Sequence, residues 1–262
     1  LPNVEVVRAF DQAPYQLSWS NDEHVARVPF LVSDALPLVS IEFNGRPVTV
    51  IFDTGADLFI LDPEIASDLG IKSVSTAVGT FGGGKQAKIG FAKIDSVRVG
   101  DLTFNQVPVM TLPTKRFSQA FADGKYTIGG FIGTAALRKC LGTIDYEHAQ
   151  MILRERNQTG REQLQRDLGG QVLVEMPFAL DSTHMMMARG SLNDRDGLTF
   201  FVDSGLASEA AFSAPRQTLE YAGIPLPQTR LREGPGGGGG SWAAGEFAIQ
   251  RLALGSLVQT DL

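Results

Sequence analysis

Apolar and polar residues alternate along most of this chain in short runs, and glycine, proline or asparagine interrupts each run. A period of two is typical of β-strands with one buried face. Such alternation occurs at residues 38–43 and 92–99, and strands are also expected at residues 48–52 and 185–192. The pattern predicts many short strands joined by turns.

The second half of the chain repeats the features of the first half in the same order. Residues 38–43, a turn and the apolar run 48–52 lead to Asp53-Thr54-Gly55. Residues 185–192, a turn and the apolar run 198–202 lead to Asp203-Ser204-Gly205. A glycine-rich stretch follows each motif, and a further strand is expected after it, at residues 92–99 in the first half and 247–254 in the second. Because the order of features is kept, we expect two copies of one lobe.

The repeat predicts four parts of the chain: a lead segment at 1–27, a first lobe at 28–155, a linker at 156–171 and a second lobe at 172–262. Residues 154–170 are polar, charged and interrupted by glycine, which is typical of a surface connector with one helical turn. The second copy lacks counterparts of the last strands of the first. We expect a continuation of the chain rather than an incomplete lobe, because a half-built sheet would expose an unpaired edge.

Short helices are predicted at residues 63–69, 135–140 and 215–222, and the remaining pattern favours strands and turns. The predicted fold class is therefore all-β with few short helices. The 29 glycines and 13 prolines agree with this class, because these residues favour tight turns.

Composition narrows the classes of function. The formal charge of -6 lies over both halves without a basic stripe, which argues against nucleic acid as a partner. Cys140 has no internal disulfide partner and is expected to be a small buried residue. No apolar run is long enough to span a bilayer, and the non-methionine start favours an exported or periplasmic protein after signal removal.

This chain lacks the sequence patterns of several other classes of enzyme. His24, His148 and His184 are isolated in the sequence and form no zinc-binding pattern. The chain also lacks the Gly-x-Ser-x-Gly motif of many serine hydrolases. We expect no metal and no cofactor.

The two Asp-Thr/Ser-Gly motifs carry the candidate chemistry. Each follows an apolar strand, so each places a carboxylate at a strand end beside a hydroxyl and a glycine that permits a sharp turn. Two carboxylates that face each other cannot both ionise, so the pair shares one proton. The ionised member of such a pair can act as the general base for a water molecule.

The segment Ile51-Phe52-Asp53-Thr54-Gly55-Ala56-Asp57 resembles the signature of the retropepsin-like aspartic proteases, especially bacterial forms with two retroviral-type lobes in one chain. Phe131-Ile132-Gly133 resembles a second element of that family, two apolar residues before a glycine. The resemblance implies two homologous acid-protease-like β lobes with a cleft between them.

The resemblance also implies roles for individual residues. Asp53 and Asp203 would be catalytic, and the residues that support them would be Thr54, Gly55, Ser204 and Gly205. The candidates for substrate binding are Ala56, Asp57, Phe81, Gly82, Gly83 and Trp242. Asp57 could equally be a solvated loop acid. The hairpins at 79–90 and 234–245 would be flaps over a bound peptide, or passive loops.

The chain departs from the family pattern at three places. Thr134-Ala135 stand where retroviral enzymes carry an arginine that supports the counterpart of Asp57, and Leu206 replaces a small residue. The second copy also has no apolar-apolar-glycine element.

The expected function is an aspartic endopeptidase, a monomer that binds an extended peptide between its lobes. The alternatives are a catalytically inactive peptide-binding module of the same fold and a homodimer of first lobes regulated by the second.

Overall fold

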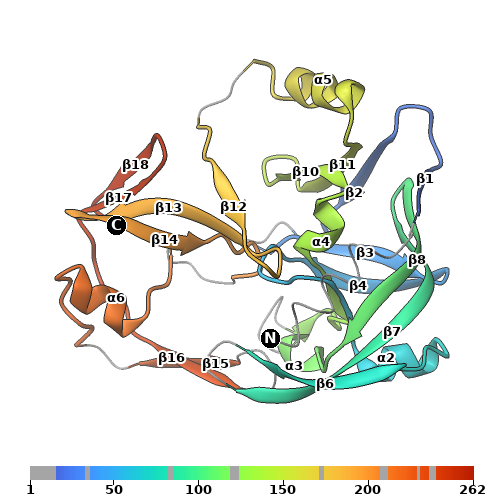
Figure 1. Ribbon diagram of the computed structural model, residues 1–262, viewed down its shortest axis with the longest axis horizontal. Helices are drawn as coiled ribbons and strands as arrows, with labels where there is room; N and C mark the ends of the chain where they lie inside the picture. The colour runs from blue at the N-terminus through green and yellow to red at the C-terminus, as the bar shows by residue number, and fades with distance from the viewer. Residues whose placement is uncertain are drawn as a thin grey trace.

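The computed structural model describes residues 16–32, 36–81, 85–118, 124–170, 174–206, 212–228, 231–235 and 240–262. Within these residues the protein is mostly β, with four sheets and a few helices (Figure 1). The prediction of an all-β fold is therefore confirmed.

The largest sheet has eight strands in the order β1-β8-β5-β9-β4-β3-β7-β6. Their bounds are β1 (Gln16–Trp19), β3 (Leu38–Phe43), β4 (Arg46–Phe52), β5 (Phe59–Leu61), β6 (Ser75–Thr80), β7 (Gln86–Val99), β8 (Leu102–Thr111) and β9 (Gly130–Ile132). All three residues of β9 are buried. This strand pairs in parallel with the end of β4, opposite Val50, Ile51 and Phe52.

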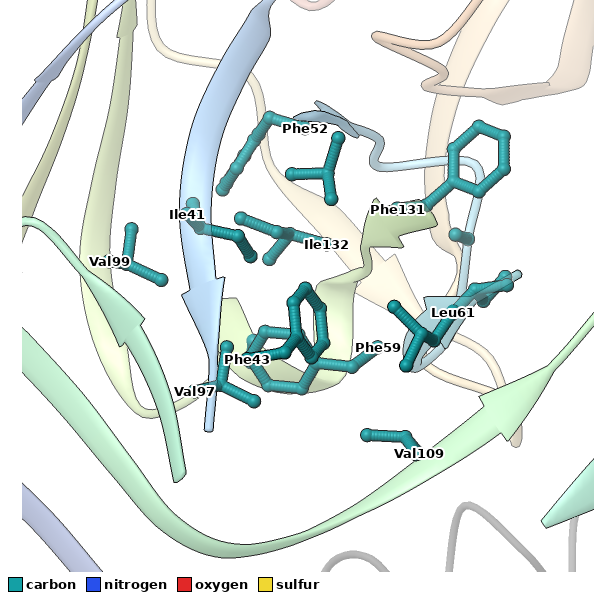
Figure 2. Close-up of a cluster of buried hydrophobic side chains, with 14 of the residues drawn as sticks. Ile41, Phe43, Phe52, Phe59, Leu61, Val97, Val99, Val109, Phe131 and Ile132 are labelled. Carbon is teal, nitrogen blue, oxygen red and sulfur yellow. The ribbon is translucent and has the colours of Figure 1, made fainter. Parts of the chain in front are cut away.

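The hydrophobic core of the first lobe lies against this sheet. Figure 2 shows side chains from distant strands that converge on one cluster, among them Phe43, Phe52, Phe59 and Ile132. All four are at most 1% exposed. The rings of Phe59 and Phe104 meet edge to face, with centroids 5.2 Å apart. This packing fixes the end of β4, from which the first motif begins.

A three-stranded sheet, β10 (Cys140–Asp145), β11 (Gln150–Glu155) and β2 (Val25–Pro29), lies next to α5 (Gln158–Asp167). The prediction of a connector with one helical turn was wrong, because α5 is a ten-residue helix capped by Asn157. Arg154, which the sequence placed in a surface connector, is a fully buried residue of β11. It forms an ion pair with Asp167, at the end of α5.

The second lobe contains a five-stranded sheet and a two-stranded ribbon. The sheet consists of β12 (Phe178–Leu180), β13 (Met186–Leu192), β14 (Arg195–Phe201), β17 (Arg251–Leu254) and β18 (Leu257–Thr260), and the ribbon of β15 (Arg232–Pro235) and β16 (Ser241–Ala244). The strand predicted at residues 247–254 is shorter than expected. Phe247 lies before β17 and packs its ring against Phe212.

The two lobes repeat the same local geometry. Asn44 and Asn193 both have a φ of 48° in the turns that follow β3 and β13. The side-chain oxygen of Asn44 accepts a hydrogen bond from the N–H of Ser96, and that of Asn193 accepts one from the N–H of Arg251. The repeat found in the sequence is therefore a repeat of structure, in which each turn contacts a later strand.

Besides α5, the described residues contain three helices that follow the sequence prediction with small shifts and one, at Lys115–Ser118, that was not predicted. They are α2 (Pro63–Asp68), α3 (Lys115–Ser118), α4 (Thr134–Leu137) and α6 (Arg216–Tyr221). The helix predicted at residues 135–140 ends early, because Cys140 already pairs with Glu155 in the β10–β11 ladder. Cys140 is buried, and burial raises the pKa of its thiol to about 12. None of the helices in the described residues is long and apolar enough to cross a membrane.

Candidate active site

The strand β4 ends directly before Asp53, and β14 ends directly before Val202, which is followed by Asp203. The N–H of Asp53 donates to the carbonyl of Ile132 at 2.9 Å, so β9 also fixes the start of the first motif. The N–H of Val202 donates to the carbonyl of Met186 at 2.9 Å, which ties the start of the second motif to β13. Both aspartates therefore follow strand ends held by backbone pairing.

A reciprocal set of hydrogen bonds joins the two motifs. The Thr54 hydroxyl donates to the carbonyl of Val202 at 2.7 Å and accepts from the N–H of Ser204 at 2.9 Å. The Ser204 hydroxyl donates to the carbonyl of Phe52 at 2.9 Å and accepts from the N–H of Thr54 at 3.0 Å. Each hydroxyl thus satisfies one donor and one acceptor of the opposite backbone. This network holds the two turns in a fixed relation.

The two carboxylates lie against each other's glycine. The N–H of Gly55 donates to Oδ1 of Asp53 at 2.7 Å, and the N–H of Gly205 donates to Oδ1 of Asp203 at 2.8 Å. A Cβ on Gly55 would lie 2.5 Å from Oδ1 of Asp203, and one on Gly205 would lie 2.5 Å from Oδ1 of Asp53. Only glycine leaves room for this approach.

The surroundings of Asp53 favour its protonated form. Burial is the main cause that raises the pKa of Asp53 to about 8, and the charge of Asp203 and a hydrogen bond with its side chain act in the same direction. The N–H groups of Gly55 and Gly205 oppose the shift. Both aspartates keep part of their surface exposed, so a ligand can reach them.

Asp57 is buried, with only 5% of its surface exposed. The prediction that it could be a solvated loop acid was therefore wrong. Desolvation is the main cause that raises the pKa of Asp57 to about 6, against hydrogen bonds from the N–H groups of Asp57 and Leu58. Asp181, from the second lobe, raises the pKa further.

The helix α4 supports the loop that carries Asp57. The N–H groups of Thr134 and Ala135 each donate at 2.9 Å, to the carbonyls of Ala56 and Asp57. Gly133 packs so closely that a Cβ there would lie 2.5 Å from the carbonyl oxygen of Leu58. The two residues that replace the family's arginine thus support the loop through their backbone.

The remaining candidates lie on the two hairpins. Phe81 closes the β6–β7 hairpin through a 2.9 Å bond from its N–H to the carbonyl of Lys85, and its side chain packs partly against the first core. Gly82 and Gly83 lie outside the described residues. Trp242 lies in β16, with its backbone opposite Gly234. Ala56 is buried and directs its carbonyl toward α4.

Two residues near the site were not predicted from the sequence. Nη1 of Arg138, which follows α4, lies 2.7 Å from Nε2 of His184, in the turn between β12 and β13. Only the absence of arginine at residues 134 and 135 suggested that support for this region would come from elsewhere. Among the residues that the structure describes, no three His, Cys, Asp or Glu side chains gather as a metal site would require.

Comparisons with known proteins agree with the motif. Residues 39–135 match the family model described as aspartyl protease, a range that contains Asp53 but not Asp203. No curated protein sequence matches the chain.

Two solved structures are similar to parts of the chain. The retropepsin-like aspartic protease from Rickettsia conorii is 17% identical, with 54% of this chain and 94% of that chain covered and a TM-score of 0.34. Conglutin gamma, a basic 7S globulin from lupine seeds, is 10% identical, with 66% of this chain and 61% of that chain covered and a TM-score of 0.39. By sequence, the part of this chain at residues 39–135 is therefore similar to the aspartyl protease family.

Proposed function

We propose that this protein is an aspartic endopeptidase and that Asp53 and Asp203 are its catalytic pair. The observation that carries the proposal is the reciprocal packing of the two carboxylates, each beside the opposite glycine, within the network of Thr54 and Ser204. A buried carboxylate pair that shares one proton contains a general base and a general acid in one site.

The proposed reaction uses both members of the pair. The ionised carboxylate removes a proton from a water molecule, whose oxygen attacks the carbonyl carbon of the scissile peptide bond. The protonated carboxyl group donates its proton to the carbonyl oxygen. Collapse of the tetrahedral intermediate breaks the C–N bond. The leaving nitrogen takes up the proton that the water gave to the first carboxylate, and one hydroxyl of the intermediate returns its proton to the second carboxylate.

An extended peptide or protein is the proposed substrate, bound by one monomer that supplies both aspartates. The β6–β7 and β15–β16 hairpins are the proposed flaps, since an extended peptide can pair with the edge of a β-ribbon. Asp57 and Ala56 on one side, and Phe81 and Trp242 on the hairpins, are the proposed contacts for the substrate.

Cleavage of a mixed peptide library by wild type, Asp53→Asn and Asp203→Asn tests this proposal. We expect each substitution to lower kcat/KM by about 10³-fold or more, because each removes an acid–base group. Asp196→Asn is the matched control, since Asp196 is an exposed residue of β14. It should retain wild-type activity.

Each of the other outcomes would indicate a different function or assembly. Cleavage that survives Asp203→Asn but not Asp53→Asn would indicate a site formed by two first lobes. No cleavage by folded wild type, together with binding of a statine-type peptide, would indicate an inactive peptide-binding module.

A further inference from the structure

The contact between Arg138 and His184 requires a hydrogen-bond acceptor on the histidine ring. Nη1 of Arg138 lies 2.7 Å from Nε2 of His184. A guanidinium group has only donors, so Nε2 must accept this hydrogen bond. This geometry fits an imidazole that carries its only proton on Nδ1.

The turn that presents His184 is fixed by its own hydrogen bonds. The carboxylate of Asp181 accepts bonds from the N–H and the hydroxyl of Thr183, both at 2.8 Å, and from the N–H of Met185 at 3.0 Å. His184 has a φ of 64°, in the left-handed region that non-glycine residues seldom occupy. Such a conformation persists where the surroundings determine it, and it often marks a functional constraint.

On the side of the first lobe, Arg138 is connected to the loop that follows Asp53. Its N–H donates to the carbonyl of Thr134 at 3.0 Å, and α4 in turn binds the carbonyls of Ala56 and Asp57. A shift of Arg138 would therefore move the support of the first motif.

On the side of the second lobe, His184 is connected to the strand end that carries Asp203. Met186, two residues later, accepts the N–H of Val202 at 2.9 Å, and Met187 pairs with Phe201. The contact of Arg138 with His184 thus joins the supports of both aspartates, at a place separate from the Thr54–Ser204 network.

We infer that Arg138 and His184 are a positioning pair between the lobes, which holds the two aspartates in register only while His184 is neutral. Protonation of the imidazole removes the acceptor and places a second positive charge beside Arg138. Histidine is the side chain that ordinarily changes charge between about pH 5 and 8. The catalytic consequence rests on the proposed endopeptidase function, whereas the contact itself does not.

Other charged groups lie near Arg138 and His184. Desolvation raises the pKa of Asp181, but hydrogen bonds from Thr183 and Met185 outweigh it, so the pKa lies below its ordinary value. Asp181 lies on the same turn as His184, and its charge also raises the pKa of Asp57. On the side of the first lobe, Nη1 of Arg156 donates to the carbonyl of Arg138 at 3.0 Å.

The tautomer of His184 tests the contact without any cleavage assay. We expect ¹⁵N NMR at about pH 8 to show His184 as the Nδ1–H tautomer. Assignment would come from loss of the signal in His184→Gln. An Nε2–H tautomer, or a protonated ring at that pH, would overturn the inference.

Paired substitutions test the effect on catalysis. His184→Gln keeps an acceptor that does not titrate, so the acid limb of the kcat/KM profile should move to lower pH. His184→Phe removes the acceptor and should lower kcat about tenfold at all pH values, with KM little changed. Both variants place a non-glycine side chain at the left-handed position, so the difference between them isolates the acceptor.

His148→Gln is the control, because the exposed imidazole of His148 contacts Asp145, far along the chain from His184. Its profile should match wild type. An acid limb that stays in place in His184→Gln would refute the positioning role. If wild type cleaves no peptide, the proposed function fails, and the tautomer alone decides on the contact.

Discussion

At the scale of single residues, the two motifs act through bonds that cross between the halves of the chain. Thr54 and Ser204 each satisfy a backbone donor and a backbone acceptor of the opposite turn, at 2.7 to 3.0 Å. Buried backbone groups without partners are costly, so each hydroxyl stabilises both turns at once.

Thr54→Ala should destabilise the protein by about 2 kcal/mol, because it leaves the carbonyl of Val202 and the N–H of Ser204 without their partner. Thr54→Ser keeps the hydroxyl and should cost less than about 1 kcal/mol. Urea unfolding monitored by circular dichroism measures both. Equal losses would show that the methyl group, rather than the hydrogen bonds, accounts for the effect.

The carboxylate pair predicts a dependence of stability on pH. Because the folded state raises the pKa of Asp53 to about 8, the folded protein binds more protons than the unfolded chain between pH 3.8 and that value. The contribution of the pair is therefore complete below pH 3.8 and is lost as the pH rises toward 8.

Comparison of wild type with Asp53→Asn isolates this contribution. Relative to wild type, the variant should gain on the order of 1–3 kcal/mol of unfolding free energy between about pH 4 and 8. Urea titrations at a series of pH values measure the difference. A difference that is constant with pH would contradict a shared proton in the folded state.

At the scale of elements, the buried side chain of Arg154 attaches α5 to the sheet β10-β11-β2. Arg154 is fully buried, pairs with Asp167 and donates from Nη1 to the Thr143 hydroxyl at 2.9 Å. Arg27 reaches the same carboxylate of Asp167 from β2 at 3.3 Å. The segment between the lobes is therefore anchored over its helical part.

Asp167→Asn should destabilise the protein by about 2 kcal/mol, because it removes the charged partner of a buried guanidinium group. Arg27→Gln is the matched comparison and should cost less than about 1 kcal/mol, since Arg27 is half exposed. Thermal or urea unfolding gives both values. Similar losses in the two variants would contradict the buried anchor.

The same ion pair predicts a loss of stability in acid. The hydrogen bond from Arg154 is the main cause that holds the pKa of Asp167 below its ordinary value of 3.8. The contribution is present above pH 3.8 and is lost as the pH falls through the lower folded pKa. It therefore has the opposite sign to that of the carboxylate pair.

At the scale of the whole molecule, the two lobes differ in how much apolar surface they bury. Among the described residues, the first core extends from Ala26 to Leu153, whereas the second is a small cluster around Leu192 and Leu252. Phe178 and Phe201 of the second sheet remain 51% and 44% exposed. The second lobe is therefore expected to be the less stable part.

Hydrogen exchange measures this difference. Amides of β13 and β17 should exchange at least about tenfold faster than those of β3 and β4, because local opening costs less where fewer apolar contacts are lost. The comparison uses one sample at one pH, with intrinsic exchange rates divided out. Equal protection in both sets would indicate that the lobes unfold as one unit.

The sequence by itself determined the local structure and the identity of the carboxylate pair. Strands such as β3 and β4 follow from alternation of apolar residues and from the Asn44-Gly45 turn, which are properties of neighbouring residues. The two Asp-Thr/Ser-Gly motifs were visible because the repeat placed them at equivalent points. Local pattern thus predicted the elements and the candidate catalytic residues.

Only the tertiary structure decided which distant side chains meet and which charges are buried. Arg154 and Asp57 are buried against the usual preference of charged residues, so composition and periodicity could not indicate their positions. The bond between Arg138 and His184 joins residues 46 positions apart, and it depends on how a helix of one lobe meets a turn of the other. Such contacts follow from the packing of whole elements, which no local stretch of sequence specifies.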